Sequence, residues 1–185
     1  IIEQQRAVFL DRDGVINVNH GYVHDQENFE FIDGIFEVAR AAHANGYKLI
    51  VITNQSGIGR GYYSEKQFNQ LTTWMCGKFS KAGAPIEKVY FSPFHPTAGH
   101  GVYKKDDISR KPRPGMIYQA QREMNLNLES SILIGDKASD IQAGIAAGVG
   151  LNILLGQKRP SMLRSLPYQA ISTLHEALPF MDGSQ

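Results

Sequence analysis

Short apolar runs alternate with longer, more polar segments along this chain. The runs occupy residues 7–10, 49–52, 89–91, 132–134 and 151–155, and they are rich in Val, Ile and Leu without polar alternation. Strands buried on both faces of a parallel sheet have this pattern. The runs therefore predict five buried parallel strands.

The segments between the runs carry helix signals. Ser64 to Gln67 has the form of a capping box, and apolar residues follow at 68, 71, 75 and 79. Further helices are expected after Pro114, over 138–147 and over 173–178. Strands alternating with helices predict an α/β fold, with a three-layer, open, mostly parallel, Rossmann-like sheet.

Composition narrows the class of protein. A length of 185 residues fits one domain, and 42% hydrophobic and 20% charged residues are ordinary for a globular protein. A net charge of +1 argues against nucleic acid or a membrane surface as partner. The single cysteine rules out an internal disulfide, and the first six residues lack a signal-peptide layout. A cytoplasmic location is expected.

Polar residues follow the predicted strands at their carboxyl ends. Asp11 and Asp13 follow the first strand, Thr53 follows the second, and Asp136 follows the fourth. Lys111 lies just before the helix that leads into the fourth strand. In an open parallel sheet, ligands bind beyond the carboxyl ends of the strands. These side chains are therefore expected to meet at one edge.

Each feature alone has a simpler explanation. An Asp-x-Asp-Gly segment is often a turn, Lys111 alone would be a solvated surface charge, and Asp140 could lie on an exposed helix face. These explanations are independent of one another. All the features in this order, each at the correct strand end, indicate a catalytic site.

A cluster of carboxylates needs a cation to offset its repulsion. Mg²⁺ prefers oxygen ligands and commonly binds one or two carboxylates together with substrate phosphate. Asp11 and Asp136 are the expected side-chain ligands, and Asp13 is expected to contribute its backbone carbonyl.

The same residues suit phosphoryl transfer. With Mg²⁺ and Lys111 beside it, Asp11 is expected to have a lowered pKa and to act as the nucleophile. Asp13 would donate a proton to the leaving oxygen and later accept one from water. Thr53 and Lys111 would stabilise the transferred group.

These motifs resemble those of haloacid dehalogenase superfamily phosphatases. The matching residues are Asp11-Arg12-Asp13-Gly14, Thr53, Lys111, and Gly135-Asp136 with Asp140. The gaps between the motifs are too short for an extra folded cap, so a capless site covered by loops is expected in a single phosphatase domain over 1–185.

Longer segments narrow the resemblance to the D-glycero-D-manno-heptose-1,7-bisphosphate 7-phosphatase family. They are residues 9–17, 20–23, 29–31, 53–58 and 110–112. The resemblance implies removal of the 7-phosphate from the sugar bisphosphate through an aspartyl-phosphate, in nucleotide-activated heptose biosynthesis. It also implies substrate contacts by Asn19, His20, Gly21, Tyr22, Thr53, Asn54, Gln55, Ser56, Arg110 and Lys137, with Arg110 recognising the phosphate that is not cleaved.

One loop departs from the family pattern. Many members hold a structural zinc with three cysteines and a histidine, and the matching positions here are Ser92, Phe94, Asp107 and Ser109. Structural zinc prefers thiolate and imidazole ligands, so no structural zinc is expected. Other contacts would then have to order residues 94–109.

Two alternatives remain. Histidinol-phosphate phosphatases share the core motifs and would act on a monophosphate. A phosphoacceptor signalling domain also combines acids, Thr and Lys on an α/β sheet, but its acceptor Asp ends the third strand, where this chain has Ser92-Pro93. We favour the sugar bisphosphate phosphatase, working as a monomer.

Overall fold

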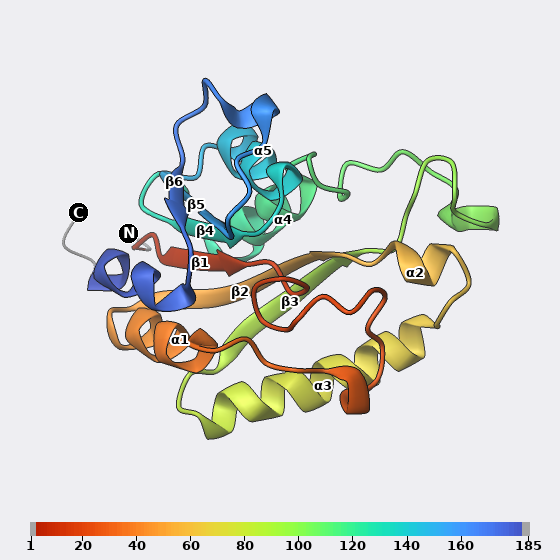
Figure 1. Ribbon diagram of the computed structural model, residues 1–185, viewed down its shortest axis with the longest axis horizontal. Helices are drawn as coiled ribbons and strands as arrows, with labels where there is room; N and C mark the ends of the chain where they lie inside the picture. Colours follow the sequence, from red (N-terminus) through yellow and green to blue (C-terminus); the bar gives the residue numbers. More distant parts are fainter. Residues whose placement is uncertain (1–2, 183–185) are drawn as a thin grey trace.

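The computed structural model describes residues 3–182 and is built on one sheet of parallel strands (Figure 1). The strands are β1 (Arg6–Leu10), β2 (Tyr47–Asn54), β3 (Ile86–Ser92), β4 (Ile132–Gly135), β5 (Leu151–Leu155) and β6 (Gln169–Ile171). They lie in the order β3-β2-β1-β4-β5-β6, and each neighbouring pair is parallel. The open parallel sheet that the sequence predicts is confirmed.

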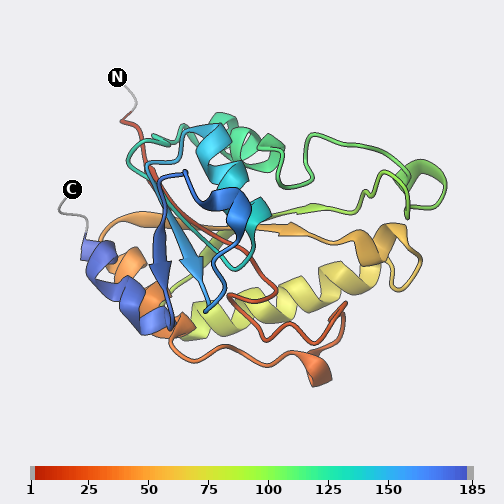
Figure 2. The ribbon, with the colours of Figure 1, turned by 45° about the horizontal axis from the view of Figure 1, so that its top comes forward.

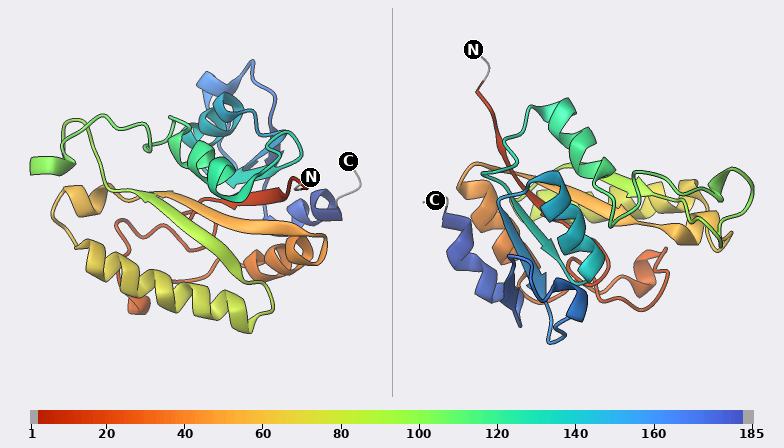
Figure 3. Two further views of the ribbon diagram at one scale, coloured as in Figure 1. Left: turned by 180° about the vertical axis from the view of Figure 1, so that it is seen from behind. Right: turned by 90° about the horizontal axis from the view of Figure 1, so that it is seen from above.

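Helices cover both faces of the sheet and make the three layers (Figures 1 and 3). One face packs α1 (Ile35–Ala44), α3 (Glu65–Lys81) and the C-terminal 3₁₀ segment Leu174–Asp182. The other packs α4 (Gly115–Met124) and α5 (Ala138–Ala147). Alternate residues of β1 point to opposite faces, so Val8 and Leu10 join the first core while Ala7 and Phe9 join the second.

Helix α3 begins where the sequence predicts. The Ser64 hydroxyl accepts from the Gln67 backbone N–H at 3.1 Å, and Gln67 Oε1 accepts from the Ser64 N–H at 2.8 Å. The helix buries its predicted apolar stripe, which consists of Phe68, Leu71, Met75 and Phe79. Helix α5 also has its predicted bounds and ends at Gly148.

The C-terminal region differs from the prediction. Strand β6 was not expected, because it has three residues and begins with exposed Gln169, which leaves no apolar run to detect. The helix expected over 173–178 is instead the 3₁₀ segment Leu174–Asp182, which contains Pro179. Proline lacks the N–H that an α-helix would need there.

The connections at the carboxyl edge are loops and short helices. Between β2 and β3 lie α2 (Ser56–Gly59) and α3, and between β3 and β4 a long loop carries the 3₁₀ turn Gly101–Tyr103 before α4. This loop extends beside α2 (Figure 2), and the His100 N–H donates to the Gly59 carbonyl at 2.8 Å. Within residues 3–182 every named strand belongs to the one sheet, as expected for a capless site.

No helix in the described part of the chain is both long and apolar enough to span a bilayer. The first two residues, part of the segment considered for a signal peptide, lie outside the described residues.

Candidate active site

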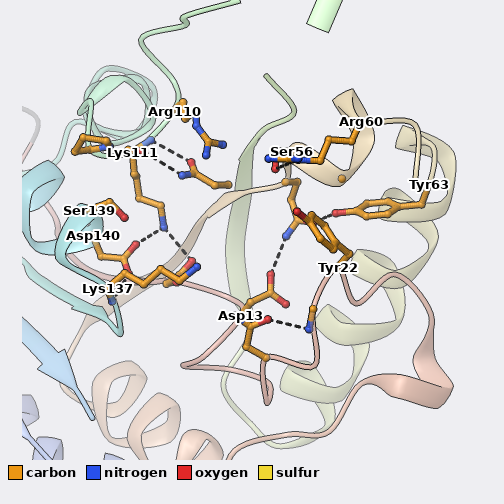
Figure 4. A pocket seen from close by; sticks show the side chains of 17 residues that line it. Asp13, Tyr22, Ser56, Arg60, Tyr63, Arg110, Lys111, Lys137, Ser139 and Asp140 are labelled. Carbon is orange, nitrogen blue, oxygen red and sulfur yellow. Dashed lines mark hydrogen bonds and ion pairs between the residues drawn. The ribbon is translucent and has the colours of Figure 1, made fainter. Parts of the chain in front are cut away.

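Three strands deliver their polar residues to the carboxyl edge of the sheet, where a cavity opens. Asp11 lines this cavity, whereas Thr53 and Asp136 are not among its lining residues. β1 lies between β2 and β4, so Asp11, Thr53 and Asp136 come together although they are far apart in the sequence. The cavity has a volume of about 560 Å³ (Figure 4). Its lining includes the predicted residues Asp11, Asp13, Asn19, Gly21, Tyr22, Asn54, Gln55, Ser56, Arg110, Lys111 and Lys137. It also includes Asp140, which belongs to the family motif but had no assigned role, and residues that were not predicted, namely Gly57, Arg60, Tyr63, Pro112 and Ser139.

Lys111 forms the centre of a buried ion network. Its ammonium group donates to Asp11 Oδ1 at 2.9 Å, to Asp140 Oδ1 at 2.6 Å and to the Ile52 carbonyl at 2.9 Å. Burial works against the charge, but the carboxylates of Asp11 and Asp140 outweigh it and raise the pKa of Lys111. Lys111 is therefore a fixed cation and is not the solvated surface charge considered above.

Three carboxylates surround this one ammonium group. Ligand oxygens of Asp11, Asp136 and Asp140 lie within 4.8 Å of one another. Burial, and then the charge of Asp140, raise the pKa of Asp11 well above its usual value, although Lys111 lowers it. This direction is opposite to the expected one, because burial and the neighbouring carboxylates outweigh Lys111, whereas the expectation included a bound cation.

The acidic cluster fits a hard divalent cation. Oδ1 of Asp136 is buried, and no hydrogen-bond donor of the described residues reaches it. The backbone makes room for this carboxylate at Gly14, which has φ of +94° and where an added Cβ would lie 2.0 Å from Asp136 Oδ2. Oxygen ligands with unused lone pairs are the donor set that Mg²⁺ prefers.

Asp13 has different surroundings from Asp11. Its Oδ1 accepts from Arg12 Nη2 at 2.9 Å and from Asn17 Nδ2 at 3.0 Å, and its Oδ2 accepts from Gln55 Nε2 at 3.1 Å. The Asp13 side chain is thus held by protein donors and is separate from the acidic cluster. That its backbone carbonyl binds the metal stays a prediction.

Asp140 is a site residue whose role the sequence left open. It is buried, its Oδ1 pairs with Lys111, and its Oδ2 accepts from the backbone N–H groups of Asp136 and Lys137 at 3.1 Å each. The interpretation as an exposed helical residue is wrong. The available signal was an acid in the first turn of a helix, four residues after Asp136.

Residues at the end of β2 hold neighbouring site residues in place through hydrogen bonds. Thr53 is buried, and its hydroxyl accepts from Gln55 Nε2 at 2.9 Å. Asn54 Oδ1 accepts from the Lys111 N–H at 3.0 Å, and Asn54 Nδ2 donates to the Lys111 carbonyl at 3.2 Å. Asn54 therefore fixes the backbone from which Lys111 extends.

A second group of cations lies farther out. We call Arg60, Arg110 and Lys137 the rim, and Asp11, Lys111, Asp136 and Asp140 the floor. Within residues 3–182 no rim residue forms a salt bridge, and the Arg110 side chain makes one long hydrogen bond, to the Phe94 carbonyl at 3.3 Å. Burial and then the charge of Arg60 lower the pKa of Arg110. Unpaired cations that repel each other are suited to binding an anion.

The loop after β1 completes the wall of the cavity. Figure 4 shows Tyr22 with Arg60 and Tyr63 on one side, and Lys111, Lys137 and Asp140 on the other. Asn19 Oδ1 accepts from the Gly21 N–H at 3.1 Å. The predicted position of His20 in the cavity is not observed, because its exposed ring instead pairs with Glu30 at 3.0 Å.

Three of the four positions that the resemblance matches to zinc ligands, Ser92, Asp107 and Ser109, make direct contacts with one another. Ser109 Oγ donates to Ser92 Oγ at 2.7 Å, and Asp107 Oδ2 accepts from the Ser109 N–H at 3.0 Å. His95 Nδ1 accepts from the N–H groups of Thr97 and Ala98 at 3.2 and 2.9 Å. The loop 94–109 is therefore held by hydrogen bonds within it and by hydrogen bonds to Ser92 and Gly59.

Comparisons with known proteins agree with this geometry. The family described as polynucleotide kinase 3 phosphatase matches residues 8–159. The D-glycero-alpha-D-manno-heptose-1,7-bisphosphate 7-phosphatase of Burkholderia mallei is 52% identical over 97% of this chain and 95% of its own. The beta-anomer counterpart of Vibrio cholerae is 49% identical over 83% of each chain. The solved D,D-heptose 1,7-bisphosphate phosphatase from B. bronchiseptica, complexed with magnesium and phosphate, shares the fold at 22% identity with a TM-score of 0.82, covering 95% of this chain and 97% of its own.

Proposed function

The chain belongs to the D-glycero-D-manno-heptose-1,7-bisphosphate 7-phosphatase family, within the haloacid dehalogenase superfamily, and from this membership we propose that it removes the 7-phosphate of that sugar bisphosphate. The observation that carries the proposal is that the acidic floor and the cationic rim lie at the same cavity. An acidic floor around Lys111 suits cleavage of one phosphate, and a cationic rim suits recognition of the other.

In the proposed reaction Asp11 is the nucleophile. One of its carboxylate oxygens bonds to the phosphorus of the 7-phosphate as the bond from phosphorus to O7 breaks, and Asp13 supplies the proton that O7 takes up. Water then attacks the aspartyl-phosphate, Asp13 accepts a proton from that water, and inorganic phosphate leaves with Asp11 restored. Lys111, held 2.9 Å from Asp11, and the Thr53 hydroxyl stabilise the charge of the transferred group.

Asp11, Asp136 and the backbone carbonyl of Asp13 are the proposed ligands of Mg²⁺. When bound, Mg²⁺ supplies positive charge that neutralises the phosphoryl oxygens and the floor carboxylates. Asp140 does not need to bind the metal, because its two oxygens are already used by Lys111 and by backbone N–H groups.

The rim is proposed to recognise the 1-phosphate, with Arg110 and Lys137 as the predicted contacts and Arg60 added by the structure. Asn19, Gly21, Tyr22 and Ser56 are proposed to surround the sugar. Asn54 and Gln55 line the same cavity, but their side chains already bond to Lys111 and Asp13. Histidinol phosphate carries one phosphate and would leave the rim cations unpaired. The rim therefore favours a bisphosphate over the histidinol-phosphate alternative.

We further propose that residues 1–185 act as one phosphatase domain in the cytoplasm, in nucleotide-activated heptose synthesis, without nucleic acid or membrane partners. A monomer is the expected state.

Phosphate release with Mg²⁺ tests the substrate. Both anomers of heptose 1,7-bisphosphate should be compared with histidinol phosphate and fructose 1,6-bisphosphate, because the relatives' names include both anomers. We expect one heptose anomer to give the highest kcat/KM. Far higher activity on histidinol phosphate or fructose bisphosphate would contradict the assignment.

The variant Asp11→Asn tests the mechanism. Removing the nucleophile should lower kcat by about 10⁴-fold or more, because the covalent step is lost. Near-native turnover by this variant would exclude Asp11 as the nucleophile, whichever ester is the best substrate.

A further inference from the structure

The side chain of Gln55 is fully engaged by the protein. It is 2% exposed, and its Nε2 donates both to Asp13 Oδ2 at 3.1 Å and to Thr53 Oγ1 at 2.9 Å. Its Oε1 accepts from the hydroxyl of Tyr63. Resemblance to the family implies that Gln55 contacts substrate, but here its amide joins Tyr63 to the carboxyl group of Asp13.

Tyr63 is itself held firmly. Its ring is buried and stacks on His24, with centroids 5.0 Å apart and planes 10° from parallel. On the other side it lies against Gly57, where an added Cβ would be 2.3 Å from the ring atom Cε1. Burial raises the pKa of Tyr63 to about 12, so its hydroxyl keeps its proton at neutral pH and remains a fixed donor.

Asp13 needs this kind of support. Arg12 and Asn17 hold Oδ1 from the loop that contains Asp13 itself, whereas Gln55 holds Oδ2 from the end of β2. Contacts from two separate segments prevent rotation of the carboxyl plane. A general acid and base works only when it lies within hydrogen-bond reach of the atom it serves, and supporting contacts maintain that placement.

We propose that Tyr63 is a positioning residue that acts through the Gln55 amide to hold the Asp13 carboxyl group in its working orientation. The inference rests on the proposed function, because it requires that Asp13 transfers protons. Tyr63 needs no contact with the substrate for this role. Its removal should therefore slow turnover without weakening substrate binding.

The test uses Tyr63→Phe, which removes the hydroxyl and keeps the ring stacked on His24. With heptose bisphosphate and Mg²⁺ we expect kcat to fall about tenfold, a part of the 10²- to 10⁴-fold that acid-base catalysis provides, with KM within about twofold. The same substitution in an Asp13→Asn background should change the single-turnover rate less than about twofold, because the group that Tyr63 positions is gone.

A matched control and a second variant complete the design. Tyr62→Phe removes the hydroxyl of the neighbouring, exposed tyrosine and should leave both constants unchanged. Gly57→Ala should displace the Tyr63 ring and reproduce the loss in kcat.

Equal loss from Tyr63→Phe in the native and Asp13→Asn backgrounds would show a merely structural effect and overturn the inference. A loss confined to KM, or no loss in the native background, would overturn it as well. Failure of the proposed function is distinguishable, because the unmodified enzyme would then release no phosphate from heptose bisphosphate.

Discussion

Arg110 and Lys111 are adjacent in the sequence, yet they belong to two different regions of the cavity. Lys111 is 4% exposed, and its ammonium group makes three hydrogen bonds, two of them to carboxylates. Arg110 is half-buried, and among the described residues its guanidinium group makes one hydrogen bond, a 3.3 Å contact with the Phe94 carbonyl. The floor is organised before any ligand arrives, whereas the rim keeps its cations available.

This difference separates chemistry from selection. A preorganised charge stabilises a transition state without reorganisation, so the floor determines what reaction occurs. Cations without a carboxylate partner gain most from an incoming anion, so the rim determines which phosphate ester binds well. Changes to the floor should act on kcat and stability, and changes to the rim should act on KM.

The largest effect is expected from Lys111→Met, which leaves the floor carboxylates without their ammonium partner. Breaking a buried ion network by removing one partner costs about 3–5 kcal/mol, and kcat should fall by about 10³-fold with the lost transition-state charge. Urea unfolding and steady-state kinetics measure the two effects. Lys88→Met, which removes an exposed lysine paired with Glu123, is the control and should change neither. A stable, active Lys111→Met enzyme would contradict the floor as described.

Magnesium should stabilise the protein next most strongly. At 100 times its Kd a ligand of the folded state adds about 2.7 kcal/mol, which raises Tm by roughly 5–10 °C in a chain of this size. Thermal denaturation with Mg²⁺ and with a chelator should show this shift, and Asp136→Asn should reduce it. If that variant responded like the unmodified protein, Asp136 would not be a ligand.

At the rim, Arg110→Ala should raise KM for heptose bisphosphate about 10- to 100-fold, since one charge-assisted contact is worth about 1.5–3 kcal/mol. Its kcat should change little, and kcat/KM for a sugar monophosphate should stay within about twofold. Arg113→Ala removes a nearby exposed arginine, which pairs with Asp106 at 3.0 Å, and serves as the control. If kcat/KM fell equally for the monophosphate and the bisphosphate, Arg110 would act on the reaction itself and not on recognition of the second phosphate.

The smallest effect is expected from Ser109→Ala, which removes the 2.7 Å bond to Ser92 at the end of the 94–109 loop. One neutral hydrogen bond contributes about 1 kcal/mol, so Tm should fall by roughly 2–4 °C. A small rise in KM should accompany it, because Arg110 is the next residue. Ser80→Ala on the exposed face of α3 is the control and should leave Tm unchanged. An equal fall in Tm in both variants would show that the bond from Ser109 to Ser92 does not stabilise the protein specifically.

The sequence predicted the floor better than its surroundings, for a physical reason. Asp11, Thr53 and Asp136 follow apolar runs, and the carboxyl ends of parallel strands meet at one edge, so their convergence follows from the order of elements. Their placement around Lys111 required only that its loop return to the same edge.

The role of Asp140, which the sequence left open, and the participation of Tyr63, which was missed, depend on packing between distant segments. The side chain of Asp140 is buried because Lys111 reaches it from 29 positions away, and no local pattern contains that contact. Nothing in the sequence around Tyr63, an aromatic residue just before a helix, indicates a role. Its role depends on contacts with His24 and Gln55. His20 is the opposite case, a predicted residue that lies outside the cavity. The motif that contains it could not indicate that its exposed ring would pair with Glu30.

The strand order also affects how the chain folds while it is being synthesised. Of the six strands β1 is made first, and β2 can pair with it and β3 with β2 soon afterwards, but the other neighbour of β1 is β4, which begins at Ile132. Until that segment emerges, an apolar strand edge is open to pairing with other chains, which is the condition under which nascent proteins aggregate. The central place of β1, which brings the site residues together in the folded enzyme, therefore leaves one edge of that strand open to aggregation during synthesis.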